Sequence, residues 1–146
     1  MYHYIECGLS NIRLVNGFEI VETSHGKGVT IYDQEGLHEA IAMELCESES
    51  PLSGREFRFL RVQLNMSQKT LGKILNVSDQ TVANWEKETH ELPRSTDLIM
   101  RALFRESRNV ESNVQETIRK INEIDRRIDE LIFERNERWT ETSVAA

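Results

Sequence analysis

The side chains best suited to recognition chemistry lie in a short polar stretch, residues 78–87, in which Gln80 and Asn84 stand four positions apart. In a helix, this spacing places both amides on one face. Glutamine and asparagine amides can each form two hydrogen bonds with adenine in the major groove of DNA. The stretch therefore predicts a helix that reads base edges, although the same two residues would also suit an ordinary solvated helix.

Nine residues on this helix and the one before it are predicted to contact DNA. Polar side chains near the N-terminal end of the reading helix would enter the groove. Residue 68 would begin the preceding helix, where its side chain or backbone N–H would meet a phosphate with help from the helix dipole. Lysines would attract phosphates, as would Arg55 and Arg58, but each one alone also suits a solvated surface. The predicted set is Gln68, Lys69, Lys73, Ser78, Asp79, Gln80, Thr81, Asn84 and Lys87.

Capping signals predict the helices that would hold these residues. Ser53 and Glu56 match the Ser-x-x-Glu capping box. The flanking Leu52 and Phe57 are placed to form its hydrophobic staple. The predicted helices run from Ser53 to about Leu64, from Ser67 to about Leu75, from Ser78 to about Glu88, and onward from about Pro93. The second and third are joined by the short turn Asn76-Val77, which is helix-turn-helix geometry.

Residue types within these two helices fit that geometry. Gly72 lies where the helices approach closely, and Asn76 suits a left-handed turn residue, as does Asn65 at the end of the first helix. The residues expected to bury the shared faces are Leu71, Leu75, Val77, Val82 and Trp85, with the tryptophan placed in the core and not as a stacking platform. The polar face of the third helix would carry Asp79, Gln80, Thr81, Ala83, Asn84 and Lys87.

With these residues assembled, the stretch over residues 52–105 resembles the lambda-repressor/Cro-like (Xre-type) helix-turn-helix. The resemblance implies a DNA-binding dimer in a microbial or phage regulator, with Gln68, Asp79, Gln80 and Asn84 facing the groove. It also implies that Arg61 and Glu86 tie the first helix to the third. Asp79 departs from the pattern because it repels phosphate, although it could accept from cytosine N4. The matching pattern is Met66-Ser67-Gln68-x-x-Leu71-Gly72-x-x-Leu75-Asn76-Val77-Ser78-x-x-Thr81-Val82-x-x-Trp85-Glu86.

The overall layout also resembles antitoxin-type regulators of the MqsA kind, in which a small N-terminal module precedes an Xre domain. In those proteins the module holds zinc through paired Cys-x-x-Cys motifs and binds a toxin. Cys7 and Cys46 stand alone here, so zinc is not carried over. His3, His25 and His38 add no ligand spacing, and no metal or cofactor is predicted. No motif assembles a catalytic triad, so we do not expect an enzyme.

The segment before the helix-turn-helix, residues 1–47, is predicted to be a small β-hairpin or meander module with one helix. Asn16-Gly17 between the apolar runs 12–15 and 18–21 is the strongest short hairpin signal. Residues 29–32 and 2–5 would add strands. Helical spacing of Leu37, Ala40, Ile41 and Leu45 predicts the covering helix. The polar residues 47–51 read as a linker.

The segment after it, residues 110–139, is predicted to be a coiled-coil helix that forms a homodimer. Its apolar seam at heptad spacing consists of Val114, Ile121, Ile124, Ile128 and Leu131. A higher oligomer stays open, as does a helix that packs back onto its own chain. The predicted fold is therefore α+β, with a β-rich module (1–47), an all-α domain (52–108) and the coiled coil.

The charge distribution favours the middle domain as the part that meets DNA. The net charge is −7 overall, but residues 51–110 carry 10 Lys/Arg against 7 Asp/Glu, and residues 1–50 carry 2 against 9. The acidic flanks would face something other than DNA or merely be solvated. No apolar run long enough for a transmembrane helix and no signal peptide are evident, and two cysteines without a disulfide framework favour a reduced, cytoplasmic setting. Two functions are open: a transcriptional regulator that binds double-stranded operator DNA, and an antitoxin whose N-terminal module binds a toxin.

Overall fold

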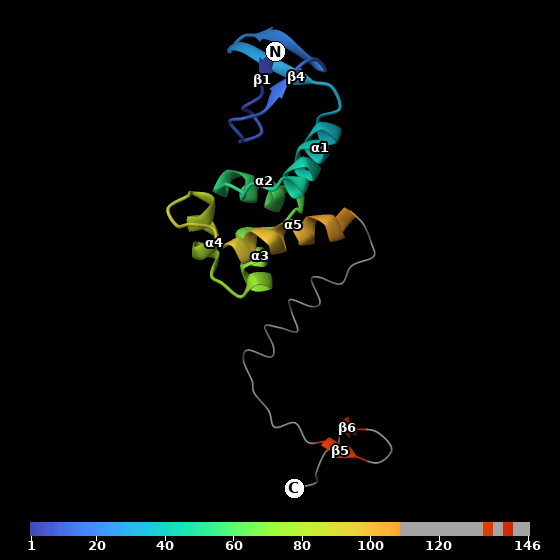
Figure 1. The fold of residues 1–146 in the computed structure, drawn as a ribbon. Helices are drawn as coiled ribbons and strands as arrows, with labels where there is room; N and C mark the ends of the chain where they lie inside the picture. The colour runs from blue at the N-terminus through green and yellow to red at the C-terminus, as the bar shows by residue number, and fades with distance from the viewer. Residues whose placement is uncertain (109–132, 136–138, 142–146) are drawn as a thin grey trace.

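A computed structural model of the chain describes residues 1–108, 133–135 and 139–141 (Figure 1). In the first of these ranges, short strands come first and five helices follow. The strands are β1 (Tyr2–His3), β2 (Arg13–Leu14), β3 (Phe18–Thr23) and β4 (Gly26–Ile31). The helices are α1 (Gln34–Glu47), α2 (Gly54–Gln63), α3 (Gln68–Leu75), α4 (Asp79–Glu86) and α5 (Arg94–Arg108).

The N-terminal strands form two separate two-stranded antiparallel sheets, β1 with β2 and β3 with β4. The predicted hairpin across Asn16-Gly17 is wrong, because the chain reverses between Thr23 and Gly26 instead. A type I′ turn needs positive φ at both central residues, and only Gly17 has it, at 77°. Pairing of all six residues of β3 with β4 satisfies more backbone groups than the predicted register could.

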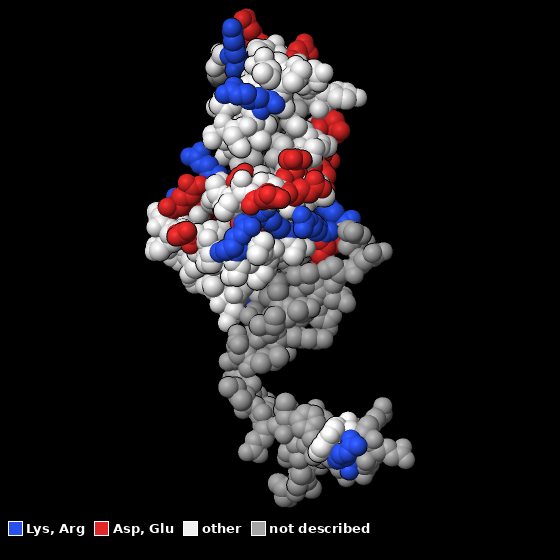
Figure 2. Space-filling view, in the orientation of Figure 1, with Lys and Arg blue, Asp and Glu red and all other residues white. Residues whose placement is uncertain are grey.

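Helix α1 forms as predicted and packs against α2 and α5. Its inner face buries Ile41, Ala42 and Leu45 in the same hydrophobic cluster that contains the helix-turn-helix core, while Ala40 is exposed. Figure 2 shows acidic and basic side chains lying beside each other across the middle of the molecule. An ion pair also joins α5 to α1, with Arg108 Nε 2.7 Å from Glu39 Oε1. The module and the helical domain therefore share one core.

Helices α2 to α4 begin at the predicted caps, and α5 begins at Arg94, directly after Pro93 as expected. Ser53 and Glu56 form the full capping box, and Ser67 and Ser78 accept from the backbone N–H three residues ahead. Asn65 and Asn76 take the predicted left-handed conformation, with φ of 59° and 57°. Helix α4 ends at Glu86, two residues before the predicted end. The core between these helices contains Phe57, Leu60, Leu71, Val82, Met100, Leu103 and Phe104.

The predicted coiled-coil seam from Val114 to Leu131 lies outside the described residues. The end of the predicted 110–139 helix differs from expectation, because β5 (Phe133–Arg135) pairs antiparallel with β6 (Trp139–Glu141). Arg135 lies opposite Trp139, with its guanidinium carbon 5.8 Å from the ring centroid. In the part of the chain that the structure describes, no helix is long and apolar enough to cross a membrane.

Candidate nucleic-acid interface

The turn between α3 and α4 is tight, and glycine at position 72 permits it. The Val77 backbone N–H donates to the Gly72 carbonyl oxygen at 2.9 Å. A Cβ placed on Gly72 would lie 2.7 Å from the Val77 carbonyl oxygen, closer than real Cβ atoms come. The predicted close approach is therefore confirmed, and it fixes the angle at which α4 leaves α3.

The buried face of α4 anchors it to the rest of the domain. Val82 is fully buried, and the Trp85 ring meets the Phe57 ring edge-on at 6.1 Å. Ala83 was predicted on the polar face, and this is wrong, because only 8% of it is exposed. Helix α4 packs against both α2 and α3, so its apolar stripe is wider than contact with one helix would need.

The opposite face of α4 carries the two amides singled out by the sequence. Gln80 Nε2 donates to Asn84 Oδ1 at 3.0 Å, which confirms that the two residues share a face. Gln80 is exposed and Asn84 is half-buried. This bond leaves Gln80 Oε1 and Asn84 Nδ2 without a partner among the described residues. The structure therefore presents one acceptor and one donor side by side.

The other predicted residues of α4 are partly engaged by the helix itself. Ser78 Oγ caps the helix by accepting from the Thr81 N–H at 3.0 Å, and it also meets Thr81 Oγ1 at 2.9 Å. Asp79 Oδ1 accepts from the Gln80 N–H at 2.9 Å. A carboxylate in the first turn is favoured by the helix dipole, so Asp79 has a structural reason to be here. Lys87 is exposed beyond the last turn.

Helix α3 presents its lysines outward, while Gln68 is held. Lys69 and Lys73 are exposed. Gln68 was expected to meet a phosphate through its side chain or its backbone N–H, but its Nε2 donates to Glu86 Oε1 at 3.1 Å. The Gln68 side chain is thus bonded to α4, and of the two groups expected to meet a phosphate only the backbone N–H at the start of α3 is left for that contact.

Glu86 is the centre of a buried network. Arg61 Nε donates to Glu86 Oε2 at 2.6 Å, and Arg61 Nη2 donates to Oε1 at 2.9 Å. The two side chains are 11% and 3% exposed. Arg61 Nη1 also donates to the Met66 carbonyl oxygen at 2.8 Å. The pair implied by the family resemblance is therefore confirmed, and it joins α2, the loop before α3, and α4.

A second buried network was missed by the sequence reasoning. The Asp97 carboxylate accepts from the Leu52 backbone N–H at 2.9 Å and from Arg101 Nε at 2.6 Å. Burial acts to raise the pKa of Asp97, but the bonds from Arg101 and Leu52 and nearby positive charge lower it overall. Arg101 also donates to the carbonyl oxygens of Ser48 and Ser50. The residues read as a linker are therefore fixed to α5.

One family model matches the helical part of the chain. Residues 57–99 match the family model described as Helix-turn-helix, which covers most of α2, all of α3 and α4, and the start of α5. This part of the chain is therefore similar to the helix-turn-helix family, in line with the Xre-type resemblance. The match does not reach the N-terminal module, so the likeness to MqsA-type antitoxins stays a prediction. No curated protein and no solved structure matches the chain.

Proposed function

We propose that this protein is a sequence-specific transcriptional regulator that places α4 in the major groove of its operator. The observation that carries the proposal is the paired amides of Gln80 and Asn84 on the exposed face of that helix. The match of residues 57–99 to the helix-turn-helix model supports DNA as the partner. A cytoplasmic protein without catalytic activity fits this role.

The hydrogen bond between the two amides prepares them for base readout. It restricts the rotation of both groups and leaves Gln80 Oε1 as an acceptor and Asn84 Nδ2 as a donor for the base. Adenine presents the complementary donor N6 and acceptor N7 in the major groove. Because the amides are ordered before binding, less side-chain entropy is lost on contact.

Phosphate contacts would flank this reading position. Lys69, Lys73 and Lys87 are exposed and free to approach the backbone. The start of α3 offers backbone N–H groups at the positive end of a helix dipole, which suits a phosphate oxygen. The Arg61–Glu86 pair and the Gln68 bond hold α3 at a fixed angle to α4. These contacts would position the reading helix without selecting sequence.

The proposal is tested by selecting binding sites from random DNA and titrating variants on the selected and on random duplexes. Gln80→Ala and Asn84→Ala should each cost ~1–3 kcal/mol per half-site on the selected site and little on random DNA. Lys69→Ala and Lys73→Ala should weaken both about equally and reduce the salt dependence. Asn16→Ala, an exposed amide in the β module, is the matched control. Parent-like binding by both amide variants would refute the reading role.

The regulator would act as a dimer on half-sites about one helical turn apart. The seam at Val114, Ile121, Ile124, Ile128 and Leu131 is the proposed dimer contact. Deleting residues 112–146 and measuring the mass in solution tests it. A monomer is expected, and an unchanged oligomeric state would remove the coiled-coil proposal.

An antitoxin role is the second candidate, favoured by the surface of the N-terminal module. Ile5, Val15, Ile20 and Tyr32 are 58%, 78%, 55% and 84% exposed. Exposed apolar side chains on an acidic module suit a basic protein partner. Co-expression with the product of a neighbouring gene, followed by purification, tests this. Recovery of a basic protein that is lost with Ile20→Glu supports it, and recovery of DNA alone counts against it.

A further inference from the structure

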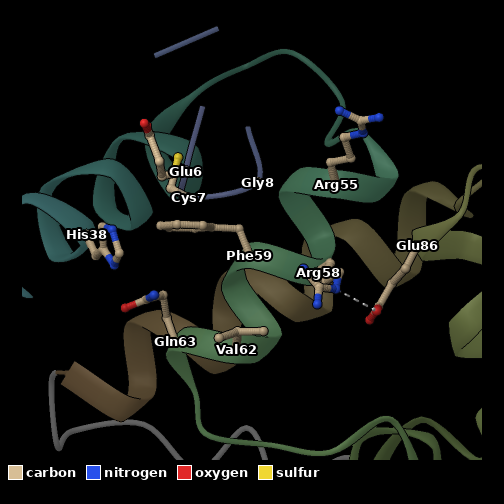
Figure 3. A pocket seen from close by; sticks show the side chains of 10 residues that line it. All are labelled: Glu6, Cys7, Gly8, His38, Arg55, Arg58, Phe59, Val62, Gln63 and Glu86. Carbon is tan, nitrogen blue, oxygen red and sulfur yellow. Dashed lines mark ion pairs between the residues drawn. The ribbon is translucent and has the colours of Figure 1, made fainter. Parts of the chain in front are cut away.

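A pocket of about 380 Å³ lies where the loop at residues 6–8, α1 and α2 meet. Figure 3 shows Phe59 extending across it, with His38 on one side and Arg55 and Arg58 on the other. Val62, 47% exposed, adds a second apolar side chain. The size falls within the range of small-molecule sites, which are apolar clefts with a few convergent polar groups.

Two arginines supply the positive charge of this pocket, and neither makes a close ion pair within the described part of the chain. Among the described residues, Arg55 has no hydrogen-bond or ion-pair partner. Arg58 is 57% exposed at its side chain, and its only ion-pair contact within residues 1–108 is Nε to Glu86 Oε1 at 3.9 Å. That carboxylate already accepts from Arg61 and Gln68. Glu6 also lines the pocket and adds a negative charge there, because the bond that it accepts from the neutral Tyr2 hydroxyl lowers its pKa and favours the ionised carboxylate.

On the side of the pocket away from the arginines, His38 and Phe59 lie near Glu6 (Figure 3). Burial lowers the pKa of His38, so its imidazole is neutral at neutral pH. Its Nε2 is bonded to the Tyr4 hydroxyl at 2.8 Å. Neighbouring Phe59 is 5% exposed and meets the His38 ring edge-on. The pocket therefore offers two guanidinium groups at one end and an apolar surface beside them.

We propose that this pocket binds a small organic anion, a carboxylate or phosphate ester carried on a ring or similar apolar body, and that the bound anion weakens DNA binding. The anionic group would sit between Arg55 and Arg58, whose planar forks suit carboxylate and phosphate oxygens. The apolar body would lie on Phe59 and Val62. The effect on DNA rests on the proposed function, whereas the pocket itself does not.

The route from the pocket to the DNA-binding face is short. Arg58 approaches the same Glu86 oxygen that holds Gln68 at the start of α3, where we place a phosphate contact. An anion bound at Arg58 would add its own negative charge to this region and so offset the positive charge of the guanidinium. Exposed charges act over about 8 Å at physiological salt, so a neighbouring DNA phosphate would feel the change. By linkage, DNA must weaken anion binding by the same factor.

The first experiment titrates the full chain, without DNA, with phenyl phosphate by calorimetry. Saturable binding is expected, and it should be about tenfold weaker for inorganic phosphate, which lacks the ring. Benzoate tests the carboxylate form of the same chemistry. Arg55→Gln combined with Arg58→Gln should weaken phenyl phosphate binding at least about tenfold, because charge-assisted bonds are lost. Lys27→Gln, an exposed cation on β4, is the control and should bind as the parent does.

The second experiment measures affinity for the selected duplex with and without saturating phenyl phosphate. A loss of about fivefold or more is expected in the parent and none in the double arginine variant. If phenyl phosphate does not bind, or if it still binds as well after both arginines are replaced, the proposed anion pocket is refuted. The pocket would also be refuted if the parent binds no anion while the arginine variant loses DNA binding. That result would indicate that Arg55 and Arg58 contact DNA phosphates. Anion binding by a parent that binds no DNA would retain the pocket and refute the proposed function.

Discussion

Replacing Arg61 with alanine tests whether the Arg61–Glu86 pair holds α4 in place. The substitution removes two hydrogen bonds to the Glu86 carboxylate and one to the Met66 carbonyl oxygen. Glu86 is 3% exposed at its side chain, so water cannot readily replace them. An uncompensated buried charge is the main cost of breaking such a pair.

The magnitude follows from what remains around Glu86. Loss of one partner of a fully buried pair costs about 3–5 kcal/mol. Here Gln68 still donates to Glu86 Oε1, and Arg58 lies 3.9 Å away and can move closer. We therefore expect the low end, about 3 kcal/mol of the free energy of unfolding. For a domain near 100 residues, that lowers Tm by roughly 12–24 °C.

Thermal and urea unfolding of Arg61→Ala provide the measurement, with Arg94→Ala as a matched control. Arg94 also pairs with a buried carboxylate, but its side chain is 50% exposed and Asp97 keeps its bond to Arg101. The control should lose no more than about 1 kcal/mol. Arg61→Leu combined with Glu86→Leu should recover more than half of the loss, because no charge is then stranded. A shift for Arg61→Ala no larger than that of the control would refute the reasoning.

Two further perturbations have defined outcomes. Gly72→Ala should lower the free energy of unfolding, measured with urea, by about 1–3 kcal/mol, because the new Cβ meets the Val77 carbonyl oxygen. Gly28→Ala is the control: its Cβ makes only ordinary contacts, so it should cost little. The pKa of His38 is lowered by burial below its usual 6.5, so the unfolded chain takes up a proton first as pH falls. Stability should therefore decrease as pH falls below 6.5, and His38→Gln, measured across the same pH series, should flatten that dependence. Equal stability of Gly72→Ala and Gly28→Ala, or an unchanged pH profile in His38→Gln, would contradict these accounts.

The helix boundaries were predictable because their signals are local. Ser53, Ser67 and Ser78 each cap a helix through a backbone N–H only three residues away. Asn65 and Asn76 adopt the left-handed conformation that their own side chains tolerate. None of these interactions depends on a distant part of the chain, so spacing along the sequence was sufficient to find them.

The features that were missed depend on partners distant in sequence. The predicted hairpin turn at Asn16-Gly17 does not form, because β3 instead pairs along its full length with β4. Arg101 reaches back to the carbonyl oxygen of Ser48, 53 positions earlier, and turns an apparent linker into a fixed segment. Polar composition alone cannot show this, because Ser48 uses its backbone and not its side chain.

The features of the candidate site also divide into local ones, which the sequence predicted, and ones that depend on distant residues, which it did not. The shared face of Gln80 and Asn84 followed from their spacing, whereas the bond between their amides depends on rotamers set by the folded surroundings. The engagement of Gln68 by Glu86 was not predicted either, since it requires α3 and α4 to be placed first. The sequence therefore predicted which residues would read DNA, and the structure shows which of their side-chain atoms have no partner within the described residues.

The central claim is that Gln80 and Asn84 determine which DNA sequence is bound. The most direct test repeats the selection from random DNA with a Gln80→Ala, Asn84→Ala double variant beside the parent and the Asn16→Ala control. The account predicts that the double variant still selects duplexes but with relaxed preference at one or two adjacent positions in each half-site. The Asn16→Ala control should show the same sequence preference as the parent at every position. The same preference at every position in the double variant would contradict the assignment of α4 as the reading helix.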